Sequence, residues 1–65
     1  MRYTLVGVNG NARTIINYVV KAMKEAYFLD EEIEAYKEDA TSDDYNHLID
    51  VSLNKIDICN ERIAQ

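Results

Sequence analysis

The chain opens with a period-two pattern and then changes to a helical one. Residues 2–8 alternate and are mostly β-branched or aromatic, which is typical of a β-strand. No later segment repeats this pattern, so the strand has no partner within its own chain. Because exposed strand edges are seldom left unpaired, we expect residues 2–8 to pair with the same segment of a second copy. The alternative is an extended arm packed on the helices.

A tight turn and a first helix are predicted directly after this segment. Asn9 and Gly10 both tolerate positive φ, and Asn11 is a typical helix N-cap. Apolar residues then recur at helical spacing as far as residue 26, with polar residues on the opposite side. These apolar positions are Ala12, Ile15, Ile16, Val19, Val20, Met23 and Ala26.

Two further helices are expected. Asp30 is predicted to cap a short acidic helix over residues 31–40, and Ser42 to cap a last helix over residues 43–63. The short helix should bury Ile33, Tyr36 and Ala40. The last helix should carry an apolar stripe formed by Leu48, Ile49, Leu53, Ile56 and Ile63. Val51 and Ile58 widen this stripe. Such a wide apolar arc favours contacts beyond the chain itself.

The predicted fold is therefore mainly α, of the α+β kind: a short N-terminal β-strand followed by three helices, in a single domain of residues 1–65. A core of this size is only marginally stabilising, and small domains compensate with disulfides, a metal or association. Cys59 is the only cysteine, which excludes an internal disulfide, and with His47 it offers too few ligands for a zinc site. Association remains, so we expect a homo-oligomer, a dimer or larger, with strand pairing between subunits.

Charge is divided unevenly along the chain. The net charge is −5, composed of +3 in residues 1–29 and −8 in residues 30–65. This division argues against direct DNA binding, which needs a basic stripe, but leaves room for a compact anion at the N-terminal half. No membrane-spanning run or signal peptide is expected, and the free thiol indicates a reducing compartment. The expected location is the cytoplasm.

The strongest local signal for binding is the turn at residues 7–13. A turn that leads into a helix N-terminus presents backbone N–H groups, which suit a phosphate or a carboxylate. Arg13 adds a guanidinium, and Asn9, Gly10 and Asn11 complete the candidate anion site. The pattern is neither a Walker loop nor a dinucleotide fingerprint. The alternative is a plain turn with an asparagine cap.

A second cluster opens the last helix. Tyr45 and His47 are candidate ligand-binding residues that could stack on or hydrogen-bond a ligand across an interface. Asp43, His47 and Asp50 have a spacing that could hold a cation, but carboxylates in a first turn are more often dipole partners, so no metal and no cofactor are expected. Cys59 lies about 18 Å along the helix from His47, which rules out a dyad within the chain. No catalytic residues are predicted.

Several motifs resemble a family of very small proteins from phages, prophages and mobile elements. The resemblance is carried by Val-Gly-Val-Asn-Gly-Asn-Ala at residues 6–12, by Asp-Tyr-Asn-His-Leu at residues 44–48 and its flank, and by Cys-Asn-Glu at residues 59–61. Two positions depart from the family pattern: Arg13 replaces an aromatic residue, and Asp43 replaces a glycine. The resemblance gives no activity to transfer residue by residue.

This resemblance favours an anti-defence role. Small oligomeric phage proteins without catalytic residues often inhibit host defence, and one strategy is a sponge that sequesters a nucleotide immune signal without turnover. The leading hypothesis is such a sponge for a cyclic or ADP-ribose-type nucleotide, in a bacterial host cell. The alternative is an acidic interaction protein whose residues 30–50 block a host nucleic-acid-binding or defence protein. A small nucleotide-cleaving enzyme, using Asp43, Asp44 or His47 at an interface, is a third reading.

Overall fold

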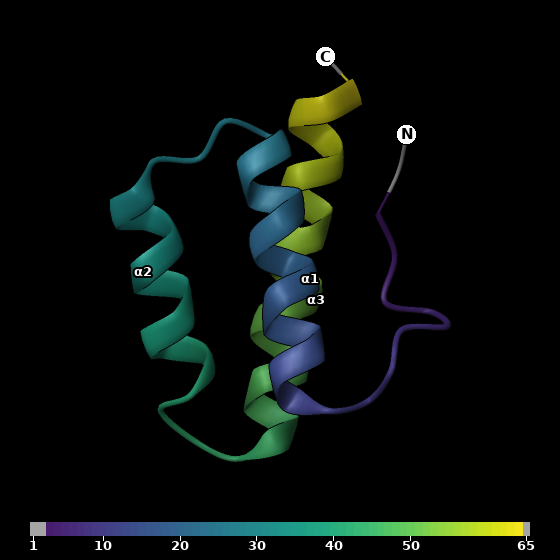
Figure 1. Cartoon of the computed structure of the whole chain (residues 1–65), viewed down its shortest axis with the longest axis vertical. Helices are drawn as coiled ribbons and strands as arrows, with labels where there is room; N and C mark the ends of the chain where they lie inside the picture. The colour runs from purple at the N-terminus through teal and green to yellow at the C-terminus, as the bar shows by residue number, and fades with distance from the viewer. Residues whose placement is uncertain (1–2, 65) are drawn as a thin grey trace.

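A computed structural model describes residues 3–64 as three helices (Figure 1): α1 (Ala12–Glu25), α2 (Asp30–Ala40) and α3 (Tyr45–Ala64). The chain runs up α1, down α2 and up α3, so α1 and α3 are roughly parallel. The bundle is flat, with Cα extents of 33 × 27 × 15 Å. None of the three helices combines the length and the apolar character needed to cross a membrane. The prediction of a mainly helical fold is confirmed.

Helix α1 is closed at both ends by local hydrogen bonds. The side chain of Asn11 accepts from the Arg13 N–H at 2.9 Å, which confirms the predicted N-cap. At the other end, the Phe28 N–H donates to the Met23 carbonyl at 3.0 Å, and the Tyr27 N–H donates to the Lys24 carbonyl at 3.1 Å. This pair of bonds forms a Schellman motif, which satisfies carbonyls that would otherwise lack donors.

The start of α2 lies one residue earlier than predicted. Leu29, not Asp30, occupies the cap position, and Asp30 is the first helical residue. The carboxylate of Glu32 accepts from the Leu29 N–H at 3.0 Å, so an acidic side chain in the first turn takes over the capping role.

The start of α3 differs from the prediction by two residues. The helix begins at Tyr45 rather than residue 43, and Asp44 is its cap: the Asp44 carboxylate accepts from the His47 N–H at 2.9 Å. Ser42, the predicted cap, instead donates its hydroxyl to the Asp39 carbonyl at 2.7 Å. The serine therefore closes the end of α2, because the Asp39 carbonyl, which also accepts from the Ser42 N–H, lies within reach of its hydroxyl.

The core lies between the buried faces of the helices, and α1 and α3 share the most extensive contact. The predicted inward residues of α2 are all buried, whereas Ile16 and Val20 of α1 are only half-buried and Ala12 is exposed. On α3 the stripe is shifted from the predicted one. Leu53 is 47% exposed, and Ser52 is buried in its place. The hydroxyls of Ser52 and Tyr36 form a buried hydrogen bond of 2.7 Å, which compensates for placing a polar group in the core.

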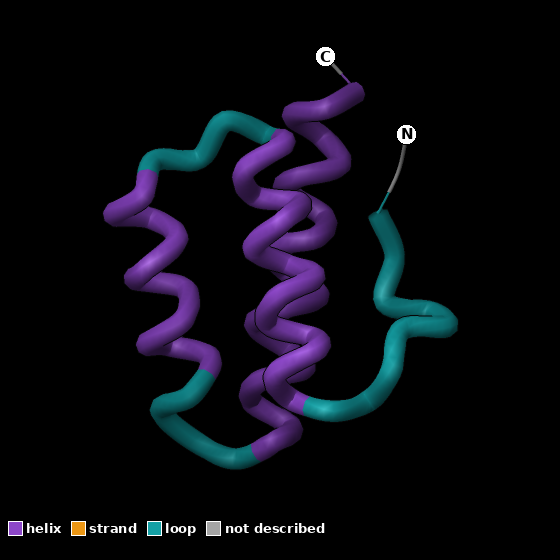
Figure 2. The backbone as a smooth tube through the Cα atoms, viewed as in Figure 1, coloured by secondary structure: helices purple, strands orange, loops and turns teal. Residues whose placement is uncertain are grey.

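The predicted N-terminal strand is wrong for residues 3–8, which form no strand in the structure (Figure 2); residue 2 lies outside the described residues. The side-chain amide of Asn60 accepts from the Tyr3 N–H at 2.8 Å and donates to the Tyr3 carbonyl at 2.9 Å. The hydroxyl of Tyr18 accepts from the Thr4 N–H at 2.9 Å. Side chains of α1 and α3 thus supply the hydrogen bonds that a neighbouring strand would have supplied. The segment is an extended arm packed on the helices, which was the alternative interpretation.

Tyr27 has an unfavourable backbone conformation for a bulky residue. Its φ is 64°, and its side chain is 90% exposed, so little side-chain burial offsets the strain. Glycine is the usual residue at this position of a Schellman motif. We therefore expect Tyr27→Gly to raise the free energy of unfolding by about 1 kcal/mol.

The comparison variant is Tyr27→Ala, which removes the ring but keeps the Cβ atom that causes the strain. Urea unfolding of the three proteins should place Tyr27→Ala close to the wild type and Tyr27→Gly above both. A Tyr27→Gly protein less stable than Tyr27→Ala would contradict the assignment of strain.

Candidate functional site

The turn before α1 is organised by its own side chains. The amide oxygen of Asn9 accepts from the Asn11 N–H at 2.9 Å, and that of Asn11 accepts from the Arg13 N–H at 2.9 Å. The hydroxyl of Tyr45, at the start of α3, donates to the Gly10 carbonyl at 2.6 Å. The structure therefore brings Tyr45 to the predicted anion site within a single chain, although 35 residues separate the two partners of this bond.

This arrangement leaves the turn rich in donors. The amide oxygens of Asn9 and Asn11 and the carbonyl of Gly10 are all occupied by internal hydrogen bonds. The amino groups of both asparagines bond to nothing else within residues 3–64, and Arg13 forms no ion pair there. The first turn of α1 also contains no acidic residue. Unused donors and an uncompensated positive helix end together favour a negatively charged ligand.

An open groove between α1 and α2 begins beside this turn. Its volume is about 720 Å³, which lies in the range of small-molecule sites. A smaller hollow of about 210 Å³ adjoins it, because both are lined by Ala12, Ile16 and Thr41. Arg13 lines the larger groove and Tyr45 the smaller hollow. The two hollows therefore connect the guanidinium to the tyrosine around the N-terminus of α1.

The wall of the groove on α2 carries charges of both signs. Lys37 forms an ion pair with Glu34, with 3.0 Å between Nζ and Oε2, and Glu38 lies one turn further along the same wall. These residues were not predicted as part of a site. Glu34, Lys37, Glu38 and Thr41 are three or four residues apart along the sequence, which places them on one side of a helix. This spacing is the sequence signal that could have identified them.

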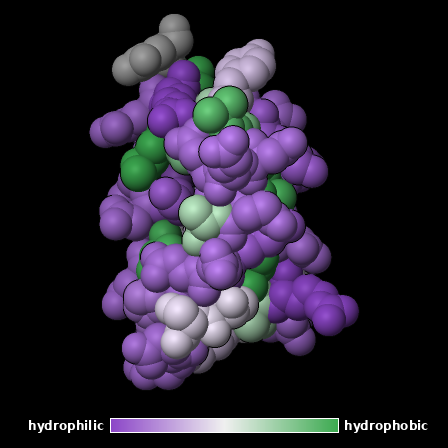
Figure 3. All heavy atoms as spheres, turned by 90° about the vertical axis from the view of Figure 1, so that its left-hand side faces the viewer, coloured by the Kyte–Doolittle hydropathy of each residue, from purple (hydrophilic) through white to green (hydrophobic). Residues whose placement is uncertain are grey.

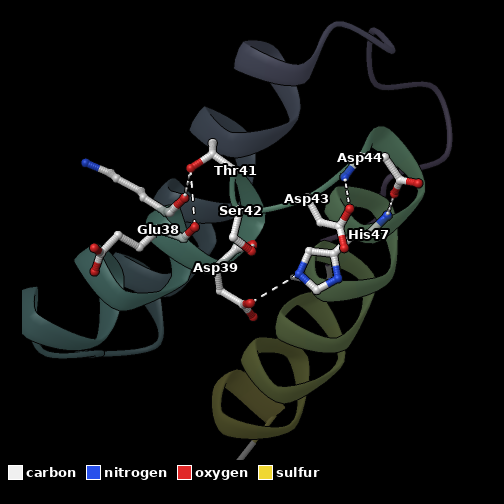
Figure 4. Close-up of polar contacts among 8 residues, drawn as sticks. Glu38, Asp39, Thr41, Ser42, Asp43, Asp44 and His47 are labelled. Carbon is white, nitrogen blue, oxygen red and sulfur yellow. Dashed lines mark hydrogen bonds and ion pairs between the residues drawn. The ribbon is translucent and has the colours of Figure 1, made fainter.

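His47 is not in the turn. Its Nε2 lies 3.1 Å from Asp39 Oδ1, and the two side chains point toward one another from α3 and α2 (Figure 4). Neither the groove nor the adjoining hollow is lined by His47. The imidazole instead links the C-terminal end of α2 to the first turn of α3. The six predicted site residues thus separate into five around the N-terminus of α1 and one in an interhelical pair.

The other candidate groups have local structural roles. Asp44 caps α3, and the Asp43 carboxylate accepts from the Asp44 N–H at 2.8 Å. Within residues 3–64, no group of three His, Cys, Asp or Glu side chains is positioned to hold a metal ion. Cys59 is buried as expected, and burial raises the pKa of its thiol above the ordinary value, which disfavours the reactive thiolate.

In comparisons with known proteins, no family model, no curated protein and no solved structure matches the chain. The functional interpretation therefore depends on the geometry of the site itself. Two segments far apart in the sequence, residues 6–12 and 40–48, meet in the structure through the hydrogen bond between Tyr45 and Gly10. They also line the same hollow beside α1.

The pair of His47 and Asp39 predicts a pH dependence of stability. The hydrogen bond to Asp39 raises the pKa of His47 above 6.5, with the charge of Asp43 contributing in the same direction. A raised folded-state pKa means that the stabilisation is fully present below the unfolded value and is lost as pH rises through the folded value. We expect the stability difference between the wild type and His47→Gln to be largest in mildly acidic solution and to fall to a smaller, constant value at alkaline pH.

The measurement is direct because His47 is the only histidine. An NMR titration of its ring should give a pKa above the ordinary value in the wild type and a lower pKa in Asp39→Asn. Equal pKa values in the two proteins would show that the pair does not form in solution.

Proposed function

We propose that this protein binds a nucleotide-derived anion and sequesters it without turnover, as a phage-type anti-defence protein in the bacterial cytoplasm. The observation that carries the proposal is the donor-rich turn, in which the asparagine amino groups and the Arg13 guanidinium are unpaired within residues 3–64. Phosphate oxygens accept hydrogen bonds without donating any, so they complement such a surface.

The groove beside the turn supports a nucleotide rather than a bare phosphate. Its volume of about 720 Å³ accommodates a nucleoside next to the phosphate. Ile16 offers apolar surface for a base or a ribose face, and the hydroxyl of Thr41 and the carboxylate of Glu38 provide acceptors for ribose hydroxyls or an amino group. The ligand class proposed is therefore a cyclic or ADP-ribose-type nucleotide, held with its phosphate at Arg13.

Sequestration without turnover fits the kinds of residue present. The side chains around the groove include no cysteine or histidine, and of its two carboxylates Glu34 forms an ion pair with Lys37, which leaves Glu38. Tight binding by amides and a guanidinium requires no nucleophile.

Arg13→Glu tests this proposal. Removing the guanidinium and adding a carboxylate should weaken binding of the nucleotide by at least about ten- to a hundredfold, because charge-assisted hydrogen bonds are replaced by repulsion. Native mass spectra recorded with a panel of cyclic dinucleotides and ADP-ribose derivatives would identify the ligand. Titration calorimetry would then measure its affinity for the wild type and the variant.

The matched control is Lys21→Glu, which makes the same charge change at an exposed position of the same helix. It should retain affinity. Loss of folding does not account for a loss of binding in Arg13→Glu, since an acidic residue in the first turn favours the helix. Wild-type protein that retains no member of the panel, or Arg13→Glu with unchanged affinity, would refute the proposal.

A second candidate function is favoured by the acidic layer of the molecule. Residues 30–50 contain nine acidic residues against one lysine, and most of their side chains are exposed. The face formed by α2 is largely hydrophilic (Figure 3). We propose, as the alternative to the nucleotide sponge, that this layer blocks the basic nucleic-acid-binding surface of a host protein, since opposite charges of this density attract strongly at low salt.

This alternative predicts that the protein displaces a labelled DNA duplex from purified host nucleic-acid-binding proteins. The variant Glu31→Lys/Asp50→Lys, which leaves the groove residues unchanged, should lose this activity, and the wild-type activity should fall steeply with salt. Glu25→Lys/Glu61→Lys makes the same charge change outside residues 30–50 and should retain it. Fluorescence anisotropy of the labelled duplex measures its displacement by the wild type and by both variants. If both variants still displace the duplex, the acidic layer is excluded as the binding surface.

A further inference from the structure

The N-terminal arm is an uncharged segment. Residues 3–12 contain no acidic or basic side chain, although 29% of the chain is charged. On α3, the neighbouring residues Tyr45, Ile49 and Leu53 follow one another at intervals of four and form one uncharged row. Tyr45 bonds to Gly10, and Leu53 lines a hollow together with residues of the arm, so the row lies beside the arm. Depletion of charge is the compositional mark of an interface core.

The face formed by the arm and the row on α3 has a projection. The turn at residues 5–8 is closed by a hydrogen bond of 3.1 Å from the Val8 N–H to the Leu5 carbonyl, with Gly7 at a φ of 84°. The turn points away from the helices, to the right in Figure 1. At its tip, the side chain of Val6 is 87% exposed, which leaves an apolar group in water with no contact to stabilise it.

The same face has a hollow. Its volume is about 410 Å³, and it lies between the arm and α3, adjacent to the turn because Leu5 contributes to both. Its apolar lining comes from Tyr3, Leu5, Leu53 and Ile56, and its polar lining from Thr4, Asn60 and the charged Asp57. The hollow therefore offers an aliphatic side chain apolar contacts on the side formed by Tyr3, Leu5, Leu53 and Ile56.

From these features we infer that the protein forms a two-fold dimer through this face, in which Val6 of each subunit enters the hollow between the arm and α3 of the other. A projection and a complementary hollow on one surface are what a two-fold interface requires, because both subunits use the same patch. The charge distribution favours a second copy as the occupant. Two chains of net charge −5 repel one another, and the repulsion is least where the facing surfaces carry little charge, as they do here apart from Asp57.

This interface involves the segment for which pairing was predicted from the sequence, but through side chains rather than a shared sheet. The backbone of Tyr3 is already bonded to Asn60, so the arm contributes apolar surface instead of an open edge. The inference goes beyond nucleotide binding and does not depend on it, since no residue of the proposed Arg13 groove is needed for the contact.

The test is Val6→Asp. Since Val6 is almost fully exposed, its replacement should leave the fold and the unfolding curve of the monomer unchanged. In a dimer it would place a carboxylate in an apolar hollow beside Asp57, so the dissociation constant measured by sedimentation equilibrium should rise by at least about tenfold. The wild type should be dimeric in the same experiment.

The matched control is Leu29→Asp, which places a carboxylate at another exposed apolar residue, 65% exposed, in the connector at the opposite end of the bundle from the turn before α1. It should dimerise as the wild type does. A wild type that stays monomeric at its highest soluble concentration overturns the inference. A dimer that Val6→Asp leaves intact also overturns the inference. The same holds if Leu29→Asp dissociates the dimer as strongly as Val6→Asp does.

Discussion

The amide side chain of Asn60 bonds to both polar backbone groups of Tyr3, and the position of the whole N-terminal arm depends on this pair. An extended segment must satisfy its backbone donors and acceptors, and where it packs on helices without a strand beside it, side chains can take that role. The hydroxyl of Tyr18 likewise accepts a hydrogen bond from the Thr4 N–H. The ring of Tyr18 packs edge-on against that of Tyr3, with the ring centroids 5.5 Å apart. The arm is thereby held along α1 and α3. Its course fixes where the turn at residues 5–8 projects and how the chain enters α1.

The same interaction explains which parts of the fold could be predicted from the sequence. The three helices follow from apolar spacing and caps, and both signals are local, so element order and most buried positions were predictable. The alternation in residues 2–8 is also a local signal, but whether it yields a strand depends on Asn60, 57 residues away. Likewise, Ser52 replaces Leu53 in the core only because the hydroxyl of Tyr36 lies opposite it on α2. Hydropathy alone cannot show where a polar group will find a buried partner.

The candidate site divides in a similar way. Residues 9–13 are contiguous, so their proximity required only that the turn and the cap form. The presence of Tyr45 at the turn depends on how α3 packs on α1, which no local pattern encodes. Helix geometry nevertheless sets a limit: two positions apart, at about 100° per residue, Tyr45 and His47 point to nearly opposite sides of α3. Both could not face the same turn, and His47 contacts α2 instead.

The distribution of charge connects these features with function. Helix α2 begins with Asp30, Glu31 and Glu32, as a helix dipole favours, whereas the first turn of α1 has no acid and contains Arg13. A cation at this position forgoes about 0.3–1 kcal/mol of stabilisation. The chain has twelve acidic residues, yet none of them lies in the first turn of α1. Their absence has a physical reason if an external anion supplies the negative charge at this donor-rich turn. The uncharged arm and the acidic residues 30–50 are likewise separate along the chain, so the exposed apolar side chain of Val6 and the acidic layer lie on different segments.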